Sequence, residues 1–365
     1  MSSKRILFVI TGLGLGGAEK QVCLLADKFA ELQYDVKIVA LTGEAIILPN
    51  HKQIQVICIG MNKNVLSAVK SIFALKRIIL SFKPDVVHGH MFHANIFTRI
   101  VRSVTRSMTY LVNTAHSKNE GGRVRMLLYR LTDSLCDVTT NVSREALNAF
   151  ISVGAFKKSK SVTVYNGIDT RLFTFSAEER AKQRKVLIAN QSDKLLLAVG
   201  RLTKAKDYPT LLRAILQLPD NYKLVIIGEG QERDLIENII IEYKLSSRVS
   251  LIGRHDDVNR FYSACDLFVI SSCWEGFGLV VAEAMSCERP VIGTDAGGVR
   301  EVIGNDSFIV PISSPIELAE KILEVTHFEQ KQIVDIGYDN RQHVLRNFDI
   351  NSIAKQWLGI YKFDS

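Results

Sequence analysis

The 365-residue sequence lacks any apolar run of about 18 to 20 residues, the length that a membrane-spanning helix needs. The first apolar run, Ile6 to Ile10, is too short for the core of a secretory signal and favours a first β-strand. These absences exclude an integral membrane protein. They predict a chain that is soluble or peripheral and that stays in the cytoplasm.

The sequence also lacks the cysteine spacings of a zinc site or a disulfide framework. No two of its six cysteines form a Cys-x-x-Cys pair, and no histidine cluster accompanies them. They are therefore expected to be reduced, buried thiols. The cysteines are Cys23, Cys58, Cys136, Cys265, Cys273 and Cys287.

Acidic residues are scarce in the first half of the chain. Residues 1–170 contain 22 Lys and Arg against 11 Asp and Glu, whereas residues 171–365 contain 24 against 27. Between residues 60 and 130, twelve basic residues face only Asp85 and Glu120. This asymmetry favours a polyanionic partner over a merely solvated basic face. Aromatic residues are not interleaved with the basic ones, which argues against nucleic acid and leaves an anionic membrane or a phosphorylated substrate.

What the chain does contain is a regular alternation of apolar strand patterns and amphipathic helix patterns. In the first half, the pattern predicts strands at 5–11, 36–41, 55–59, 86–89, 110–114, 137–141 and 161–164, with helices between them. Residues 175–193 are polar, charged and helical in propensity, without a strand pattern, and are predicted to be a linker. The alternation then restarts at residue 195. We therefore predict an α/β fold of two tandem, doubly wound Rossmann-like domains that bind ligand in a central cleft.

A glycine-rich loop follows the first predicted strand. Gly12, Gly14 and Gly17 have the G-x-G-x-x-G spacing of a dinucleotide site, so an NAD-dependent dehydrogenase must be considered. However, the second strand ends at Leu41-Thr42 without the acidic residue that would bind a ribose. A purely structural turn remains a second interpretation.

Two further clusters follow strands of the second domain. Arg201 and Lys206 lie after the strand at 195–199 and suit a diphosphate, because fixed cations stabilise the charge that a departing nucleoside diphosphate gains. Glu275 lies after the strand at 267–270. Glu283 stands in an apolar stretch, where a carboxylate needs a partner such as a ribose diol or an arginine of its own domain.

These residues give the chain a resemblance to the retaining glycosyltransferases of the GT-B fold, family four, glycosyl transferases group 1. The resemblance covers nearly the whole chain, and its most specific element is the pair Glu275 and Glu283 around Gly276-Phe277-Gly278. The chain departs from the family pattern at Asp207, where glycine is usual. Other matching segments are 16–19, 85–88, 114–116, 166–169, 200–202 with Lys206, 290–292 and 297–301.

The resemblance implies a role for each matching residue. Arg201 and Lys206 would hold the donor diphosphate, Glu283 would bind the nucleotide ribose, and Glu275 would face the donor sugar. His116 would lie near the transferred sugar and act in catalysis together with Arg201, Lys206 and Glu275. The other implied donor-binding residues are Gly16, Gly17, Arg254, Gly276, Phe277, Gly278 and Leu279.

The implied reaction moves a sugar from a nucleotide-sugar, with UDP favoured over guanosine donors, to a saccharide acceptor. Catalysis would come from positioning and from stabilising the leaving diphosphate in a front-side attack, with no cofactor. No Asp-x-Asp pair occurs in the chain, so no metal is expected either. A sugar-nucleotide epimerase on the same fold is a further alternative to the glycosyltransferase.

The resemblance also assigns functions to the domains. Residues 1–172, with the C-terminal helix at 350–365 packing back on them, would bind the acceptor, and residues 173–349 would bind the donor. Basic residues among apolar ones in the helix at 65–82, and Arg99, Arg102 and Arg106 in the next helix, suit an anionic membrane surface. We therefore expect peripheral binding at the inner face of the cytoplasmic membrane and a lipid-diphosphate-linked acceptor, as in surface-polysaccharide or lipopolysaccharide assembly. The alternative is that the helix at 65–82 simply packs on the sheet.

Overall fold

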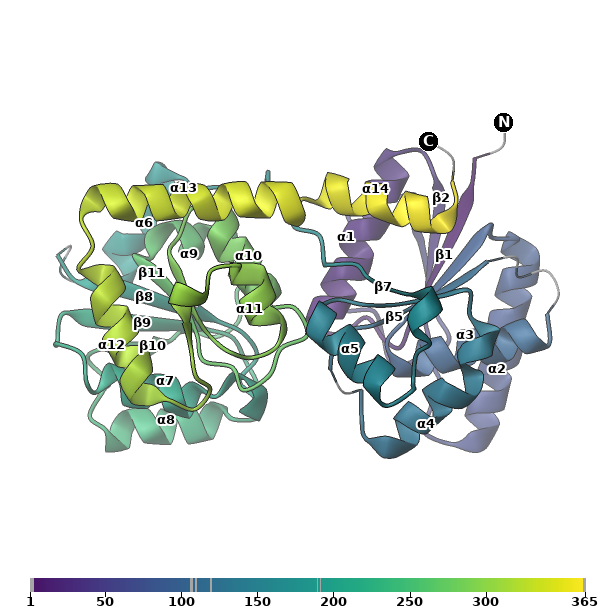
Figure 1. Ribbon diagram of the computed structural model, residues 1–365, viewed down its shortest axis with the longest axis horizontal. Helices are drawn as coiled ribbons and strands as arrows, with labels where there is room; N and C mark the ends of the chain where they lie inside the picture. Colours follow the sequence, from purple (N-terminus) through teal and green to yellow (C-terminus); the bar gives the residue numbers. More distant parts are fainter. Residues whose placement is uncertain are drawn as a thin grey trace. The chain divides into compact units, whose positions relative to one another are not determined.

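The computed structural model describes residues 3–105, 108, 110–118, 120–188, 190 and 192–363. The chain divides into two compact units, and Figure 1 labels their helices and strands. Unit 1 comprises residues 1–167 and 350–365, and unit 2 comprises residues 168–349. The predicted fold class, two parallel α/β domains in tandem, is confirmed by the sheet topology of both units.

Unit 1 contains, in its described residues, a seven-stranded parallel sheet with the order β3-β2-β1-β4-β5-β6-β7. The central strands are buried apolar runs, as expected for a sheet covered on both faces. The strands are β1 (Arg5–Ile10), β2 (Asp35–Ala40), β3 (Gln55–Cys58), β4 (Val86–His90), β5 (Leu111–Ala115), β6 (Val138–Asn141) and β7 (Ser161–Thr163).

Two layers of helices cover this sheet. On one face, α1 packs with α14, which returns from the end of the chain and buries Trp357 and Tyr361. On the other face, α2 and α3 cover Leu7, Val9 and Val87 of the sheet. The helices are α1 (Gly17–Glu31), α2 (Val65–Phe82), α3 (Phe92–Ser103), α4 (Arg123–Thr132), α5 (Arg144–Ser152) and α14 (Ile350–Tyr361), with short 3-10 turns η1 (Asp133–Leu135) and η2 (Lys158–Lys160).

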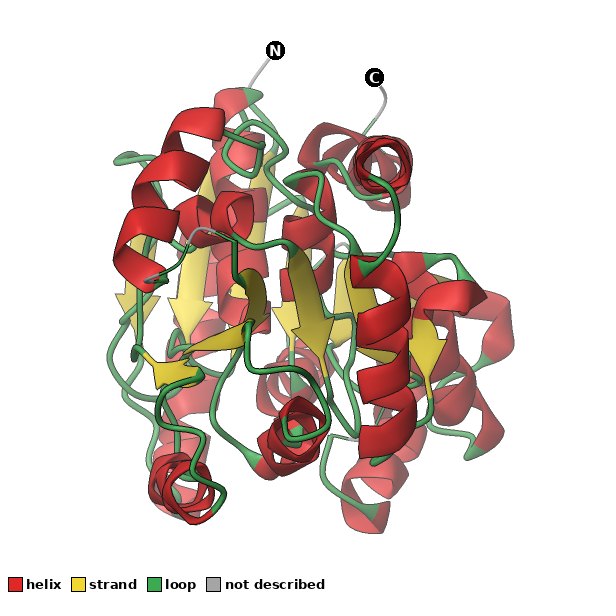
Figure 2. Cartoon of the chain, turned by 90° about the vertical axis from the view of Figure 1, so that its left-hand side faces the viewer, coloured by secondary structure: helices red, strands yellow, loops and turns green. Residues whose placement is uncertain are grey.

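The described part of unit 2 holds a six-stranded parallel sheet with the order β10-β9-β8-β11-β12-β13. Figure 2 shows yellow strands with red helices on either side of them. The strands are β8 (Lys194–Val199), β9 (Tyr222–Ile227), β10 (Val249–Leu251), β11 (Leu267–Ile270), β12 (Val291–Thr294) and β13 (Ile309–Val310). The helices are α6 (Ala177–Leu187), α7 (Tyr208–Ile215), α8 (Arg233–Glu242), α9 (Asn259–Ala264), α10 (Leu279–Ser286), α11 (Gly298–Ile303), α12 (Pro315–Thr326) and α13 (Gln330–Asn347), with the 3-10 turns η3 (Lys204–Lys206) and η4 (Asp306–Phe308).

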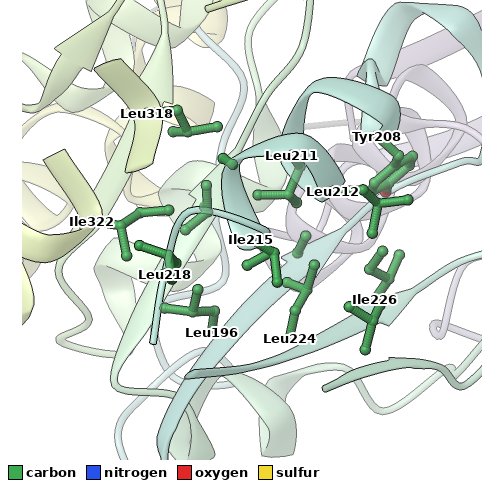
Figure 3. Close-up of a cluster of buried hydrophobic side chains, with 14 of the residues drawn as sticks. Leu196, Tyr208, Leu211, Leu212, Ile215, Leu218, Leu224, Ile226, Leu318 and Ile322 are labelled. Atoms are coloured by element: carbon green, nitrogen blue, oxygen red, sulfur yellow. The ribbon is translucent and has the colours of Figure 1, made fainter. Parts of the chain in front are cut away.

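The main core of unit 2 forms where α7 and α12 pack on β8 and β9 (Figure 3). The apolar side chains of α7 alternate at helical spacing, so one face of the helix is removed from water. The side chains labelled in Figure 3 are Leu196, Tyr208, Leu211, Leu212, Ile215, Leu218, Leu224, Ile226, Leu318 and Ile322. This core fixes the carboxyl end of β8, where the first cationic loop begins.

The predicted linker at residues 175–193 is wrong, because α6 is an integral helix of unit 2. Its polarity made it look unattached, but its arginines reach the sheet. Arg180 and Arg184 both contact the Asp266 carboxylate, and Arg180 also donates to the carbonyls of Ala264 and Cys265. These cations hold the pKa of Asp266 below its ordinary value, against the opposing effect of its burial. Charge pairing, rather than an apolar face, docks this helix.

The basic residues predicted to face a membrane from α3 also need correction. Arg99 is fully buried and donates to Asn113 and to the Tyr129 carbonyl, while Asp133 supplies the opposite charge. Arg102 pairs with the partly buried Asp137. Arg106 lies outside the described residues. Burial beside a carboxylate explains the arginines of α3 as parts of the fold.

Each sheet has one point at which the strand order reverses, between β1 and β4 in unit 1 and between β8 and β11 in unit 2. Loops that leave the carboxyl ends of the strands on either side of such a switch point diverge and form a crevice for ligand. In unit 2 these are the loops that carry Arg201, Lys206 and Glu275. In unit 1 they are the glycine-rich loop after β1 and the segment that begins at His90.

Candidate functional site

The loops after β8 and β11 are joined to each other by hydrogen bonds. The Ser271 hydroxyl donates to the carbonyls of Lys206 and Asp207 at 2.9 and 3.1 Å, and the Cys273 amide donates to the Ala205 carbonyl at 2.8 Å. The two segments that sequence reasoning selected separately therefore form one rigid rim at the switch point of unit 2.

Asp207, where the chain departs from the family pattern, takes the backbone conformation that a glycine would favour. Its φ is +46° and its ψ is +49°, the left-handed region, which aspartate tolerates better than most residues. Its carboxylate caps α7 by accepting from the Thr210 amide at 3.4 Å, and it also accepts from the hydroxyls of Thr210 at 2.8 Å and Ser313 at 3.1 Å. The aspartate thus keeps the shape of the loop and adds a helix cap.

Lys206 and Glu275 form an ion pair at the centre of this rim. Lys206 Nζ lies 2.5 Å from Glu275 Oε1, and both side chains are largely buried. The Ser272 hydroxyl donates to the same carboxylate oxygen at 2.8 Å. Tyr208 donates to the Gly200 carbonyl, and burial together with the Glu275 charge raises the pKa of its phenol. A lysine fixed in this way offers a preorganised positive charge to a phosphate.

Glu283 is buried in α10, with 7% of its surface exposed. The Tyr262 hydroxyl from α9 donates to its Oε2 at 2.6 Å. Burial and the nearby Glu283 carboxylate raise the pKa of Tyr262 well above its ordinary value, so the phenol stays protonated and acts as donor. A neutral hydroxyl is therefore one partner of this buried carboxylate.

In the turn between β11 and α10, the Trp274 side chain is exposed, whereas Phe277 and Gly278 are buried. Gly278 begins α10 with a φ of +92°, a conformation that favours glycine. Phe277 is buried and packs edge to face on Phe348 at 5.2 Å, so only its backbone is left for a ligand, whereas Leu279 and Gly276 are partly exposed. A side chain at Gly298 would come within 2.4 Å of the Gly276 carbonyl, so α11 presses this turn into place.

The two remaining predicted cations of unit 2 lie at the surface. Arg201 is exposed, and no hydrogen bond or ion pair to another described residue holds its guanidinium. Arg254 is also exposed, but it forks onto Asp256 Oδ1 at 2.7 and 3.1 Å. Arg201 is therefore available to bind an anion, whereas Arg254 would first have to leave its carboxylate partner.

In unit 1, His116 follows β5 and belongs to a row of three histidines. His116 Nε2 lies 3.0 Å from His90 Nδ1, and the ring of His88 lies 3.9 Å from that of His90. The backbone amide of His116 donates to Glu120 Oε1 at 3.0 Å. Burial lowers the pKa of His116 to about 4 and lowers those of His88 and His90 well below their ordinary value. His116 is thus a neutral imidazole near pH 7.

Gly16 and Gly17 lie in unit 1 at the start of α1, at the switch point beside β4. Gly16 is the residue before the helix, and its carbonyl accepts from the Lys20 amide. A side chain at Gly16 would come within 2.4 Å of the Glu19 carboxylate. The two glycines therefore belong to a tight strand-to-helix turn in the same unit as His116, while the other predicted donor-binding residues lie in unit 2.

Sequence reasoning missed three residues that hold the site. Tyr262 and Ser272 position the two glutamates, and no sequence pattern marks either of them. His90 orients His116, and here a signal existed. Residues two apart on a strand point to the same face, so His90 had to lie beside His88 at the end of β4.

No group of three or more His, Cys, Asp or Glu side chains among the described residues is placed to hold a metal ion. No helix in the described part of the chain is long and apolar enough to cross a membrane.

Comparison with known proteins places the chain among sugar-transferring enzymes. Residues 179–343 match the family model of glycosyl transferases group 1, and residues 15–172 match that of glycosyltransferase family 4. These matches fall on the two units in turn. Together they include His116 and all the predicted residues of unit 2, as well as Gly16 and Gly17.

Individual relatives agree with the family models. The chain is 28% identical over 317 residues to the N-acetylgalactosamine-N,N'-diacetylbacillosaminyl-diphospho-undecaprenol 4-alpha-N-acetylgalactosaminyltransferase of Campylobacter jejuni, with 82% of this chain and 83% of that protein covered. It is 24% identical over 308 residues to the UDP-Gal:alpha-D-GlcNAc-diphosphoundecaprenol alpha-1,3-galactosyltransferase of Escherichia coli, with 79% and 78% covered. The structure of Anabaena HepE in complex with UDP has a TM-score of 0.84 at 22% identity over 98% of this chain and 99% of that one. The chain belongs to the group 1 glycosyltransferases of the GT-B fold.

Proposed function

We propose that this glycosyltransferase transfers a sugar from a UDP-sugar to a saccharide acceptor carried on a lipid diphosphate, with retention of the anomeric configuration. Unit 2 would bind the donor and unit 1 the acceptor. The observation that carries the donor assignment is the buried Glu283 carboxylate, held by Tyr262 in the helix that follows the Lys206–Glu275 pair.

The donor site follows from the charges of unit 2. Glu283 would accept hydrogen bonds from the ribose diol, which would offset part of the cost of its burial. Lys206 and the exposed Arg201 would bind the diphosphate and stabilise it as it leaves. The backbone amides at the start of α10 would meet phosphate or sugar oxygens. Uridine is favoured as the base because the structural relative HepE binds UDP.

The acceptor assignment draws on the relatives. The names of the Campylobacter and Escherichia enzymes both specify acceptors linked to diphospho-undecaprenol. In unit 1, neutral His116 would donate or accept a hydrogen bond at the transferred sugar. The acceptor hydroxyl would attack from the face that the diphosphate leaves, and the leaving phosphate would take its proton. No residue is then needed as a covalent nucleophile.

Retention and metal independence can each be measured directly. We expect the anomeric proton coupling in the NMR spectrum of the first product formed to show the configuration of the donor. An inverted product would exclude the proposed front-side attack. We also expect full activity in the presence of EDTA, because Lys206 and Arg201 would supply the positive charge.

Neither alternative activity has support in the structure or the relatives. The nicotinamide dehydrogenase lacks a ribose-binding acid at the end of β2, where Ala40 is followed by Leu41 and Thr42. The epimerase would turn over donor without acceptor, and the matched family models are those of transferases.

Association with the inner face of the cytoplasmic membrane is a second proposal, carried by the charge asymmetry of the chain. The α2 helix exposes Val65, Leu66, Val69 and Phe73 beside Lys70. Such a mixture suits an anionic leaflet, to which each basic residue near the surface contributes about 1 kcal/mol. Vesicle co-sedimentation at low salt tests this association.

The donor assignment is tested by thermal shift with nucleotide-sugars. A UDP-sugar at 100 times its dissociation constant should add about 2.7 kcal/mol to the free energy of unfolding of the native chain. Glu283→Ala and Glu283→Gln should both abolish this shift, and the glutamine variant keeps an acceptor for Tyr262. Glu242→Ala, at an exposed glutamate of α8, is the matched control. A native chain that responds to no nucleotide-sugar would contradict the proposal.

A further inference from the structure

The outer face of α4 is apolar and uncovered. Val124, Leu127, Leu128 and Leu131 are 72%, 52%, 38% and 68% exposed, although their spacing is that of a helix face which normally packs against a protein core. The inner face of the same helix is already anchored, because Tyr129 is fully buried among Phe92, Phe150 and Phe156. The exposed stripe is therefore not a consequence of a poorly packed helix.

Exposed basic residues flank this stripe. Arg123 and Arg130 are exposed at the two ends of α4, and the neighbouring turn exposes Lys157 and Lys158. The chain three residues before Lys157 lies close to the helix, since a side chain at Gly154 would come within 3.7 Å of Arg130 Nε. The carboxylates that bracket α4 do not oppose these cations. Glu120 accepts from Tyr129, and Asp133 is buried beside Lys160 and Arg99.

The same helix is connected directly to the histidine site of unit 1. Glu120 receives hydrogen bonds from the His116 amide and the Tyr129 hydroxyl, and Arg125 donates to the Glu120 carbonyl. The loop that holds His116 therefore ends in α4. A contact made by the outer face of α4 would lie within one short, hydrogen-bonded segment of the proposed acceptor site.

We propose that the outer face of α4 inserts into the headgroup region of an anionic membrane and so presents the lipid-linked acceptor to His116. Apolar side chains flanked by arginines are the composition of a helix that lies in a membrane interface, where leucines enter the acyl boundary and cations pair with lipid phosphates. The inference rests on the proposed lipid-linked acceptor, and it makes α4 a membrane contact in addition to the exposed residues of α2.

Co-sedimentation of the full chain with vesicles tests this surface. The probes are vesicles of phosphatidylcholine alone and of equal parts phosphatidylcholine and phosphatidylglycerol. We expect binding to the anionic vesicles, weakened roughly tenfold or more when Leu127→Ser and Leu131→Ser remove two apolar anchors. Arg123→Gln with Arg130→Gln should also weaken binding to the anionic vesicles. The residual binding of this variant should depend less on salt concentration.

Two matched controls keep the result specific. Val186→Ser with Ile241→Ser changes equally exposed apolar residues of unit 2, which should leave vesicle binding unchanged. Leu66→Ser with Phe73→Ser changes the exposed residues of α2. Binding that is lost in the α2 variant but kept in the α4 variant would overturn the proposal, as would a native chain that ignores anionic vesicles. If the native chain were a dimer without lipid and the α4 variant were a monomer, the face would bind a second copy of the chain. That result would also overturn the proposal.

Thermal shift with UDP separates this inference from the proposed function. The α4 variants should keep the native melting temperature and the native response to UDP, because their serines are at the surface of the other unit. Transfer to a short-chain acceptor in the absence of membrane should also be unchanged, while transfer to a long-chain lipid acceptor in anionic vesicles falls. If UDP did not raise the melting temperature of the native chain, the donor assignment would be contradicted. The vesicle experiment would still decide the role of α4.

Discussion

At the residue scale, the row of His88, His90 and His116 shows how burial selects a protonation state. His90 Nε2 is buried with no hydrogen-bond partner among the described residues. A proton there would be a buried donor without an acceptor, whereas a proton on Nδ1 can be donated to His116. The favoured tautomer leaves His116 with its own proton on Nδ1. His90 is then a positioning residue that sets which atom His116 can offer to a substrate.

The same burial makes unit 1 sensitive to acid. The pKa of His116 falls from 6.5 to about 4 on folding, so the stabilisation is present above pH 6.5 and is lost as the pH falls towards 4. From His116 alone, we expect roughly 2 kcal/mol less free energy of unfolding at pH 5 than at pH 7.5. Urea unfolding at the two pH values measures this loss. In His116→Gln the pH dependence should be shallower, and an unchanged slope would show that His116 is not the group responsible.

A second prediction at the residue scale concerns Lys206, whose ammonium group is the most buried cation of the proposed diphosphate site. Replacing Lys206 by Met should lower kcat/KM by about 100- to 1000-fold, since a preorganised charge at the leaving group acts mainly in the transition state. The exposed neighbour Lys204→Met is the control and should stay near the native rate. Steady-state kinetics with a UDP-sugar measure both. Equal rates in the two variants would remove Lys206 from the reaction.

At the scale of elements, hydrophobic periodicity predicted nearly every strand. The element docked by charged side chains was predicted least well. The expected strands at 36–41 and 195–199 agree closely with β2 and β8 because a buried parallel strand is an unbroken apolar run. Residues 175–193 were expected to be helical, but the attachment of α6 to unit 2 was not predicted, because its arginines dock on Asp266 and leave no apolar stripe to recognise. The short strand β13 escaped because its two residues are too few to form a pattern.

The start of α7 offers a test of how one residue closes a loop. Asp207→Ala should destabilise unit 2 by about 2 kcal/mol, since it loses the helix cap and places an alanine in the left-handed region. Asp207→Gly should cost less than half of this, because glycine accepts the φ of +46° without strain. Thermal unfolding of the two variants measures the difference. If they were equally stable, the left-handed backbone would not contribute to the effect.

At the scale of the whole molecule, the apolar residues around each sheet form cores that belong to one unit only. The core of unit 1 is completed by α14, whose Trp357 and Tyr361 pack against α1 and β1, and Tyr361 also bonds to His88 Nδ1 at 2.7 Å. The core of unit 2 is closed within residues 168–349 by α7 and α12. Each unit can therefore respond to mutation by itself.

Hydrogen exchange can show this independence. Trp357→Ala should destabilise unit 1 by about 3 to 5 kcal/mol through the cavity it leaves, and exchange should accelerate in β1 and β4. Leu224→Ala should cost about 2 to 5 kcal/mol and act on β8 and β9 instead. Exchange followed by mass spectrometry resolves the two units. Equal acceleration in both units by either variant would mean that they unfold as one.

The sequence by itself determined the two parallel α/β domains, the loops after β8 and β11, and the glutamate pair, because strand periodicity and glycine spacing are local properties. It could not place Tyr262 beside Glu283, His90 beside His116, or Arg99 inside unit 1, because these contacts join residues far apart in the chain. Nor could it show that the apolar residues of α4 face outward, since an identical spacing normally marks a core face. Burial and partner choice depend on what packs against each residue, and only the tertiary structure decided that.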